Sequence, residues 1–392
     1  MSRRPTFARR VGAMLAAAAC AITVTACSGG VAGGPQATTS GGPLKFGMLA
    51  PMSGSESAFG DYLKNGASLA VAEINAAGGV NGSQIELIVE DDGCDPTTAV
   101  AAANKLVSQG VVASVGGYCS GATLPTLPIF LEAKVPMVIP AANSNALVEA
   151  GQANVFLING TGTQQAQAAV SFATKSKAAR IFILDDSTDY SVDLADSFEE
   201  QAKAANLTVA GRATLTPKEK DYSGEANKIT TSKADFVYFT GYYQEGALLN
   251  RQSKDAGYDG IFLVGDGAVD ASFAKITGAD YTKNVFGTFT QTPDMLEGAD
   301  NWIASYKAKF GAEPGPYTTQ AYDAVRVMAE GIKQAGSTEM DKVVAALNAL
   351  DGFATFSGPL KFTDKGTLSS GGFVIVTIGP AGTFILHDDL LG

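Results

Sequence analysis

The stretch LKFGMLAPMSGSESAFGDYLKNGASLAVAEINAAGGVNGSQIELIVEDDGCDP, residues 44–96, decides the fold of this chain. It opens with a short apolar run, Leu44–Ala50, which ends at a proline. Apolar residues then recur at helical spacing over Asp61–Ala76, and Gly-Gly and Asn-Gly turns separate that helix from a second apolar run, Ile85–Val89. An Asp-Pro pair is typical of a helix start and predicts a further helix that reaches Val107. The stretch therefore predicts strand, helix, strand and helix in succession.

Strand and helix keep alternating along the rest of the chain. Further strands are expected at Val111–Val115, Val135–Ile139, Arg180–Leu184, Val209–Leu215, Asp235–Thr240 and Ile261–Val264. Further helices are expected at Thr123–Ala133, Asp193–Ala204, Gln244–Ala256, Glu297–Phe310, Tyr317–Ala335 and Met340–Leu350, before strand-like segments at Phe373–Ile378 and Phe384–Leu386. The strands are apolar throughout, which is typical of parallel sheets covered on both faces. Two such series predict an α/β fold with two doubly wound parallel-sheet domains.

Composition excludes several classes of function. The 392 residues suggest two or three domains, and 46% hydrophobic residues are too many for a disordered chain. With 28 basic and 39 acidic residues the net charge is −11, which argues against binding to nucleic acid. His387 is the only histidine, so a histidine metal site or catalytic triad is not expected. The four cysteines do not have the spacing of a zinc site.

The first 43 residues are interpreted as a targeting segment and a tether. Four arginines precede an apolar stretch, Val11–Val24, which is too short to span a membrane and has the form of a signal peptide. Val24-Thr25-Ala26-Cys27 resembles a bacterial lipobox, which implies removal of residues 1–26 and lipid attachment to Cys27. A plain secretory signal peptide is the alternative. Residues 27–43 are rich in Gly, Ser, Thr and Pro and read as a flexible tether.

This interpretation places the chain outside the cytoplasm. No later segment is long and apolar enough to span a membrane, so the acyl chains on Cys27 would hold the protein at the outer face of the bacterial cell membrane. An exported chain meets an oxidising compartment, so the two remaining cysteines, Cys94 and Cys119, can form a disulfide. Loss of four arginines and no acidic residue makes the mature chain still more acidic.

Function is expected in the loops that follow the strands, because open parallel sheets bind ligands at the carboxyl ends of their strands. These loops carry small hydroxyls, free backbone amides, tyrosines and a lone acid, in segments 51–55, 91–96, 116–121, 140–144, 185–190, 241–243 and 265–267.

A family resemblance rests on an ordered set of such segments. They are APMSGSESAFGD, AVAEINAAGGVNG, EDDGCDPTTAVAAANKLV, GYCSGAT, VIPAANS, DDSTDYSVDLA, DFVYFTGYY, LVGDGAV and FSGPLKFTDKG, between about Lys45 and Phe373. The chain resembles the leucine/isoleucine/valine-binding protein family, type I periplasmic binding proteins that feed ABC importers. The resemblance implies two lobes joined by a three-crossover hinge, with the ligand clamped between them. By position, the N-lobe would be residues 44–159 plus 291–372, and the C-lobe residues 160–290 plus 373–392.

The resemblance also assigns the head group of an α-amino acid ligand. Ser120 matches the position that donates its hydroxyl and backbone amide to the ligand carboxylate, and it lies at an expected helix N-terminus, which favours an anion. Ala141, through its backbone, and Asn143 match the other head-group positions. Asp266 matches the acid that pairs with the ligand ammonium. Asn143 stands where a hydroxyl residue is expected, and Asp266 where glutamate is commoner.

Aromatic residues complete the implied site. Tyr190 and Tyr242 match cleft residues of the opposite lobe. Phe59, Tyr118 and Tyr317 match positions in the pocket wall, and Phe59 stands where tyrosine is expected. Each of these residues also has an ordinary reading, as a helix cap, a turn residue or a core aromatic.

The sequence predicts no catalytic residue, metal or cofactor. Ser53 has no histidine partner and no nucleophile-elbow motif, and Asp91, Asp92 and Asp95 do not fit a calcium loop. The prediction is a binding lipoprotein, not an enzyme, that delivers an amino acid, a branched-chain one first, to the permease of an ABC importer. The alternatives are a sensing module of the same fold and a binder of another amino acid or a small amide.

Overall fold

The structure is a computed structural model that describes residues 42–370 and 372–390. The expected signal peptide, Cys27 and the tether up to residue 41 lie outside the described residues. In the described ranges, no helix combines the length and the apolar character needed to cross a membrane.

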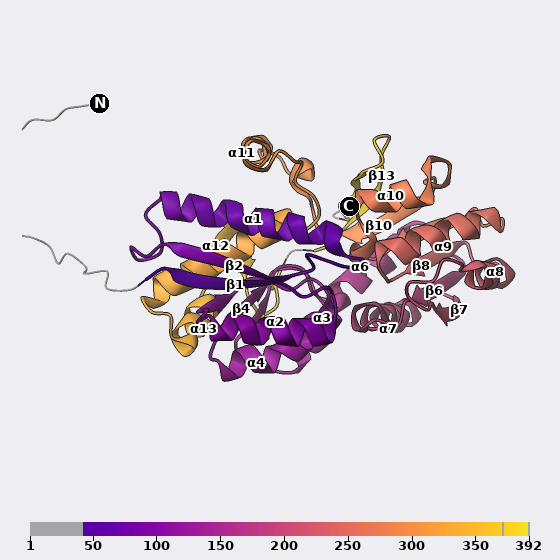
Figure 1. Ribbon diagram of the computed structural model, residues 1–392. Coiled ribbons are helices and arrows are strands. Elements are labelled where there is room, and N and C mark those ends of the chain that lie inside the picture. The colour runs from indigo at the N-terminus through magenta and orange to yellow at the C-terminus, as the bar shows by residue number, and fades with distance from the viewer. Residues whose placement is uncertain (1–41, 371, 391–392) are drawn as a thin grey trace, which may run out of the picture. The chain divides into compact units, whose positions relative to one another are not determined.

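The first sheet is built from the deciding stretch and the strands after it. It has five parallel strands in the order β2-β1-β3-β4-β5 within the described residues. Side chains of alternate β1 residues enter different cores: Phe46 and Met48 join the large core with α1 and α12, and Leu49 joins a second core with α2 and α4. Helices therefore cover both faces of this sheet, and α1 and α12 lie side by side (Figure 1).

The bounds of these elements are β1 Leu44–Ala50, α1 Ser57–Ala76, β2 Ile85–Asp91, α2 Pro96–Ser108, β3 Ala113–Ser114, α3 Ser120–Thr123, α4 Leu127–Glu132, β4 Met137–Ile139, α5 Ala146–Glu149, β5 Val155–Leu157, α12 Thr318–Ala335 and α13 Met340–Asn348. A two-stranded antiparallel sheet of β11 Asp351–Thr355 and β12 Gly358–Lys361 follows α13.

The second sheet has seven strands in the order β14-β13-β10-β9-β8-β6-β7 in the described part of the chain. Its elements are α6 Gly162–Lys175, β6 Ile181–Asp185, α7 Asp189–Ala204, β7 Val209–Thr214, α8 Ser223–Ser232, β8 Phe236–Phe239, α9 Tyr243–Asp255, β9 Ile261–Val264, α10 Ala271–Thr277, β10 Val285–Phe289, β13 Val374–Ile378 and β14 Phe384–Asp388. The sheet is parallel from β7 to β10 and ends in an antiparallel edge, because β13 pairs antiparallel with both β10 and β14. β13 and β14 are joined by a five-residue turn, and a turn this short can only connect antiparallel strands.

Both sheets have the same strand order in their parallel part. β2-β1-β3-β4-β5 in the first sheet corresponds to β7-β6-β8-β9-β10 in the second. The chain order reverses between β1 and β3, and again between β6 and β8. Connections leave such a switch point toward opposite faces, so a crevice opens at the carboxyl ends of its strands.

The chain passes between the two sheets three times in the described residues. The passages lie between β5 and α6, between β10 and α12, and between β12 and β13. The second passage contains α11, Asp300–Phe310.

Several elements differ from the sequence-based expectations. Strands β5, β10, β11 and β12 and helices α5, α6, α8 and α10 were not predicted, because each is short or has a mixed polar pattern. The expected helix Thr123–Ala133 is a chain of short pieces, α3, the 3-10 turn Leu124–Thr126 and α4, with Pro125 and Pro128 at their starts. Proline has no amide hydrogen to continue a helix, so one regular helix is not possible here.

A disulfide joins Cys94 to Cys119, with Cα atoms 5.4 Å apart. The two cysteines follow β2 and β3, which were expected to be neighbouring strands. They are not neighbours, because β1 lies between them. The bridge therefore spans the carboxyl end of β1 and ties down the loop that carries Tyr118 and Ser120.

Replacing both cysteines with serine should lower the free energy of unfolding by about 3 kcal/mol, because the bridge restricts the unfolded chain. Urea unfolding of the double variant and of the reduced wild type should give matching midpoints. Mass spectrometry of non-reduced peptides that finds both thiols free would contradict the bridge.

Glu56 precedes α1 but does not cap it with its side chain. The side chain is 2% exposed, and its Oε2 has no hydrogen-bond partner among the described residues. Burial, and then repulsion from Glu245, raise the pKa of Glu56 to about 8. Asp186 and Asp270 add to this repulsion. Glu56 comes from the first-sheet region, whereas the other three acids belong to the second, so like charges from both sides meet here.

Glu56 should make stability fall as the pH rises from about 4.5 to about 8, because over this window the folded chain keeps a proton that the unfolded chain has lost. Glu56→Gln cannot ionise, so its stability should fall by about 3 kcal/mol less than that of the wild type between pH 5 and pH 8. Glu132→Gln, which changes an exposed acid, is the matched control. Chemical unfolding at the two pH values is the measurement, and parallel pH profiles for wild type and Glu56→Gln would refute this assignment.

Candidate ligand-binding site

A small cavity lies where the carboxyl ends of the two sheets face each other. It is lined by Tyr118, Ala141, Asn143, Tyr190, Tyr242, Asp266, Gly267 and Tyr317. Seven of the nine residues assigned to ligand binding from the sequence are in this set, and the other two, Ser120 and Phe59, lie behind it. The free space between the side chains is about 10 Å³, the size of one water molecule.

The Asp266 carboxylate is the centre of the site. It follows β9 and is 1% exposed. Its Oδ1 accepts a hydrogen bond from Tyr190 Oη at 2.6 Å, and its Oδ2 accepts one from Tyr317 Oη at 2.5 Å. The amides of Asn143 and Asn159 also donate to Oδ2, at 3.1 and 3.3 Å. Asn143 and Asn159 follow strands of the first sheet and Tyr190 follows a strand of the second, so this carboxylate binds both sides of the cavity together.

All four of these donors are neutral. No Lys or Arg among the described residues forms an ion pair with Asp266, whereas buried charges in proteins are usually paired. Burial raises the pKa of Asp266, and the bonds from Tyr190 and Tyr317 counter this only in part. A cationic group brought into the cavity would therefore find a desolvated carboxylate already oriented by hydrogen bonds.

The opposite side of the cavity offers polar groups of the first sheet. Ser120 is fully buried, and its Oγ accepts hydrogen bonds from the backbone amides of Asn143 and Ser144 at 3.3 and 3.2 Å. The hydroxyl hydrogen of Ser120 is therefore left to donate to a ligand. The Ala141 carbonyl is occupied by the Asn159 amide at 2.8 Å. Helix α3, which begins at Ser120, has only four residues, so the helix dipole expected there is weak.

The aromatic residues form one continuous cluster. Phe59 stacks on Tyr118 with ring centres 4.4 Å apart, so Phe59 supports the cavity wall from behind. Tyr118 also packs edge-on against Tyr317 at 5.7 Å and contacts Tyr242 at 6.0 Å, and Tyr242 packs on Tyr190 at 5.4 Å. A Cβ at Gly267 would lie 3.0 Å from both the Tyr190 and the Tyr242 rings. This glycine is needed because it lets the rings close over Asp266.

Contacts near the rim also join the two sides. Tyr243 Oη and Gln244 Nε2, at the start of α9, both donate to the Ser55 carbonyl, at 2.7 and 2.9 Å. The backbone amide of Asn145 donates to Asp193 Oδ2 at 3.0 Å. Tyr243 therefore makes a specific contact between the two sides.

Two buried residues of the network were missed from the sequence. Asn159 follows β5, and Gln165, on α6, accepts from Asn143 at 2.9 Å and donates to Thr288 at 2.8 Å. The rule that polar residues after strands form the site would have found Asn159, had the short strand in NVFLIN been recognised. Gln165 had no comparable signal.

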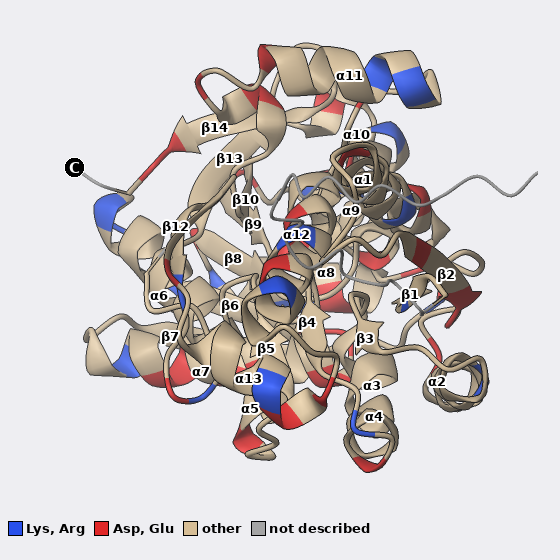
Figure 2. Cartoon of the chain, turned by 90° about the vertical axis from the view of Figure 1, so that its left-hand side faces the viewer, with Lys and Arg blue, Asp and Glu red and all other residues tan. Residues whose placement is uncertain are grey.

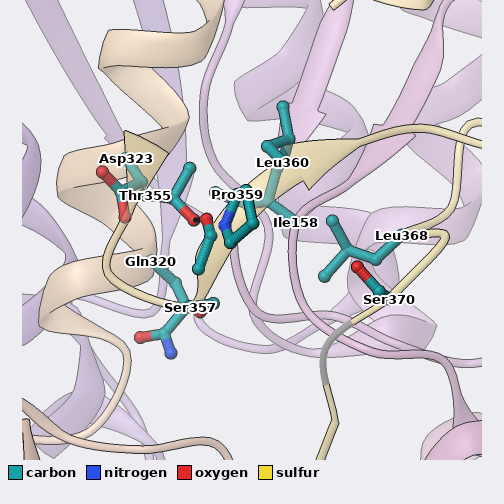
Figure 3. A pocket seen from close by; sticks show the side chains of 10 residues that line it. Ile158, Gln320, Asp323, Thr355, Ser357, Pro359, Leu360, Leu368 and Ser370 are labelled. Atoms are coloured by element: carbon teal, nitrogen blue, oxygen red, sulfur yellow. Dashed lines mark hydrogen bonds between the residues drawn. The ribbon is translucent and has the colours of Figure 1, made fainter. Parts of the chain in front are cut away.

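A second hollow lies beside α12 and is structural (Figure 3). Asp323 faces it, and burial raises the pKa of this carboxyl to about 6. Asp323 pairs with Arg326 at 2.6 Å and accepts the backbone amide of Phe356 at 2.7 Å. These bonds fix the turn between β11 and β12 to α12.

Charge is spread over the surface without a basic stripe on the face shown in Figure 2, where acidic and basic residues are interspersed. Within the described residues no group of three His, Cys, Asp or Glu side chains could hold a metal ion.

Comparisons with known proteins agree with this architecture. Residues 43–382 match the family model described as periplasmic binding protein. A leucine-, isoleucine-, valine-, threonine- and alanine-binding protein of Pseudomonas aeruginosa is 34% identical over 333 residues, which cover 85% of this chain and 89% of that protein. The Leu/Ile/Val-binding protein BraC3 of Rhizobium johnstonii is 36% identical over 84% of this chain and 90% of its own length.

Solved structures are similar over the same span. The leucine-binding protein LivK of Thermotoga maritima superposes with a TM-score of 0.81 at 29% identity and covers 88% of this chain and 97% of that one. LivJ of Streptococcus pneumoniae, solved with isoleucine, has a TM-score of 0.79 at 27% identity, over 87% and 97% of the two chains. The predicted fold class, two doubly wound lobes of the type I periplasmic binding protein fold, is thus confirmed. The chain belongs to the periplasmic binding protein family, whose members are exported solute-binding components of transport systems.

Proposed function

We propose that this protein is a lipid-anchored binding protein that captures an amino acid outside the cell and delivers it to the permease of an ABC importer. Branched-chain amino acids are the first candidates, because several relatives are named for leucine, isoleucine and valine. The observation that carries the proposal is Asp266, a buried carboxylate with four neutral donors and no cationic partner among the described residues. A ligand ammonium completes this arrangement.

The ligand would be held by both sides of the cavity. Asp266, Tyr190 and Tyr242 act on the ammonium side, and Ser120 binds the carboxylate. Ala141, through its backbone, and Asn143 complete the site for the head group. Residues 44–159 plus 291–372 and residues 160–290 plus 373–392 act as two lobes that rotate about the three chain passages. Contacts to both lobes exist only in the closed form, so a ligand shifts the population toward closure.

Two alternatives share this site. A sensing module of the same fold would close on the same ligand but would report it to a signalling partner, so neighbouring genes for a permease and an ATPase favour transport. Another amino acid or a small amide would satisfy the same cavity, since Asn143 and Asp266 depart from the residues expected for the family. Catalysis is not proposed, because no nucleophile with an adjacent base lines the cavity.

A thermal-shift screen of the purified protein against the twenty amino acids and small amides identifies the ligand, because binding to the folded state raises the melting temperature.

Asp266→Asn should weaken binding of the best amino acid by at least about thirtyfold, because it removes one member of a buried charge pair. Wild-type affinity should fall as the pH is lowered through the raised pKa of Asp266, where protonation removes the charge, and the variant should lack this dependence. Unliganded stability should change little, since the amide oxygen still accepts from a tyrosine.

Calorimetric titration measures these affinities, with Asp280→Asn, an exposed acid, as the control. Equal affinity of Asp266→Asn and wild type would move the ammonium site elsewhere.

Cys27→Ser should release the protein from the membrane fraction, because the proposed acyl chains could no longer be attached. Cys20→Ser lies within the expected signal peptide and is the matched control, which should stay membrane-bound. Cell fractionation and immunoblotting are the measurements. A membrane-bound Cys27→Ser protein would show that another feature anchors the chain.

A further inference from the structure

The cavity wall contains no leucine, isoleucine or valine side chain. It consists of four tyrosines, one asparagine, one aspartate, Ala141 and Gly267. An aliphatic ligand side chain binds against aliphatic or aromatic carbon, which only Ala141 and the tyrosine rings supply here, and Tyr118 adds a phenol hydroxyl that has no partner among the described residues. We propose that the preferred ligand is an amino acid with a short, branched, hydroxyl-bearing side chain, of which threonine is the standard example. This inference rests on the proposed function and specifies its substrate.

Tyr118 carries the argument. Its side chain lines the cavity and is only 5% exposed, and its hydroxyl has no hydrogen-bond partner among the described residues. Three rings hold it: Phe59 stacks on one face at 4.4 Å, Tyr317 packs at 5.7 Å and Tyr242 at 6.0 Å. The phenol therefore cannot turn toward bulk solvent without breaking these contacts. A buried hydroxyl without a partner is unfavourable, and a ligand that supplies the missing hydrogen bond is bound more tightly.

A second unpartnered group lies in the same region. Glu56 is 2% exposed, and its Oε2 has no partner among the residues that the structure describes. Glu56 directly precedes α1, whose Phe59 ring stacks on Tyr118, and after burial its carboxyl is the largest contributor to the raised pKa of both Tyr118 and Tyr242. Glu56 and Tyr118 follow β1 and β3, which are adjacent at the switch point of the first sheet. A ligand hydroxyl both donates and accepts, so it can satisfy a phenol and extend toward a carboxyl.

Valine tests the role of the hydroxyl because its side chain has nearly the same shape as that of threonine. A site built to hydrogen-bond a hydroxyl discriminates strongly against the analogue that lacks it, because the polar groups of the site are then left unpaired. The free space holds about one water molecule, so any amino acid requires the surrounding rings to move, and leucine and isoleucine, being larger, require more movement of rings that pack on Phe59. The Pseudomonas aeruginosa relative, whose name includes threonine and alanine, shows that the family can take short side chains.

The experiment is calorimetric titration of the mature protein with threonine and with valine. Wild type should bind threonine at least about tenfold more tightly than valine. Tyr118→Phe keeps the ring and its stacking but removes the hydroxyl, so it should weaken threonine about tenfold and leave valine within about twofold. Tyr258→Phe, whose hydroxyl donates to the Ile261 carbonyl away from the cavity, should leave the ratio unchanged.

The unliganded melting temperature separates this role from a structural one. Tyr118→Phe should keep or raise it, since no hydrogen bond inside the described chain is lost. Valine binding as tightly as threonine, or an unchanged ratio in Tyr118→Phe, overturns the inference and leaves the proposed function intact. Preference for an unrelated amino acid in the thermal-shift screen would also overturn the inference and leave the proposed function intact. No stabilisation by any amino acid would overturn the proposed function itself.

Discussion

The arrangement of the whole site depends on one buried carboxylate. Asp266 receives hydrogen bonds from residues that belong to both sheets, and none of the four donors carries a charge. Without these donors a carboxylate could not remain in so dry a position, and without the carboxylate the two faces would lose their common partner. The closed position of Tyr190 and Tyr317, the need for glycine at position 267, and the orientation of Asn143 all follow from satisfying this group.

Much of the fold could be predicted because the deciding pattern is local. Apolar β-strands of the first sheet, such as Leu44–Ala50, are separated from amphipathic helices by Gly and Asn-Gly turns, and these signals act over a few residues. Prediction failed where a strand has few residues, as at β5, or where its partners are distant in sequence. The antiparallel direction of β13 follows from pairing with β10, which lies more than eighty residues earlier in the chain, and no local signal reports such a pairing.

The site was predicted unevenly for a related reason. Ala141 and Asp266 lie in loops after recognised strands, which the general rule that ligands bind at carboxyl ends indicates, and the family resemblance then assigned their roles. Asn159 was missed together with its strand, and Gln165 reaches the network from a helix that the pattern did not reveal. Glu56 lies in a polar loop, and such a sequence predicts an exposed acid. Its burial results from the approach of the second sheet, which cannot be deduced from the sequence around it.

Because the two sheets share one strand order, each presents its own set of loops to the proposed ligand site. In the proposed site, the groups for the ligand ammonium come mainly from the second sheet, whereas Tyr118, Phe59 and Glu56, at the proposed side-chain end, come from the region of the first. One hydrophobic core reaches both sheets, but the loops after β1 and β3 are separate from the loops after β6 and β9, so substitutions in the first pair of loops need not alter the second pair. Substitutions in the loops after β1 and β3 can thus change which ligand side chain is preferred while the head-group site stays intact. Binding proteins with new ligand preferences can therefore evolve readily from this architecture.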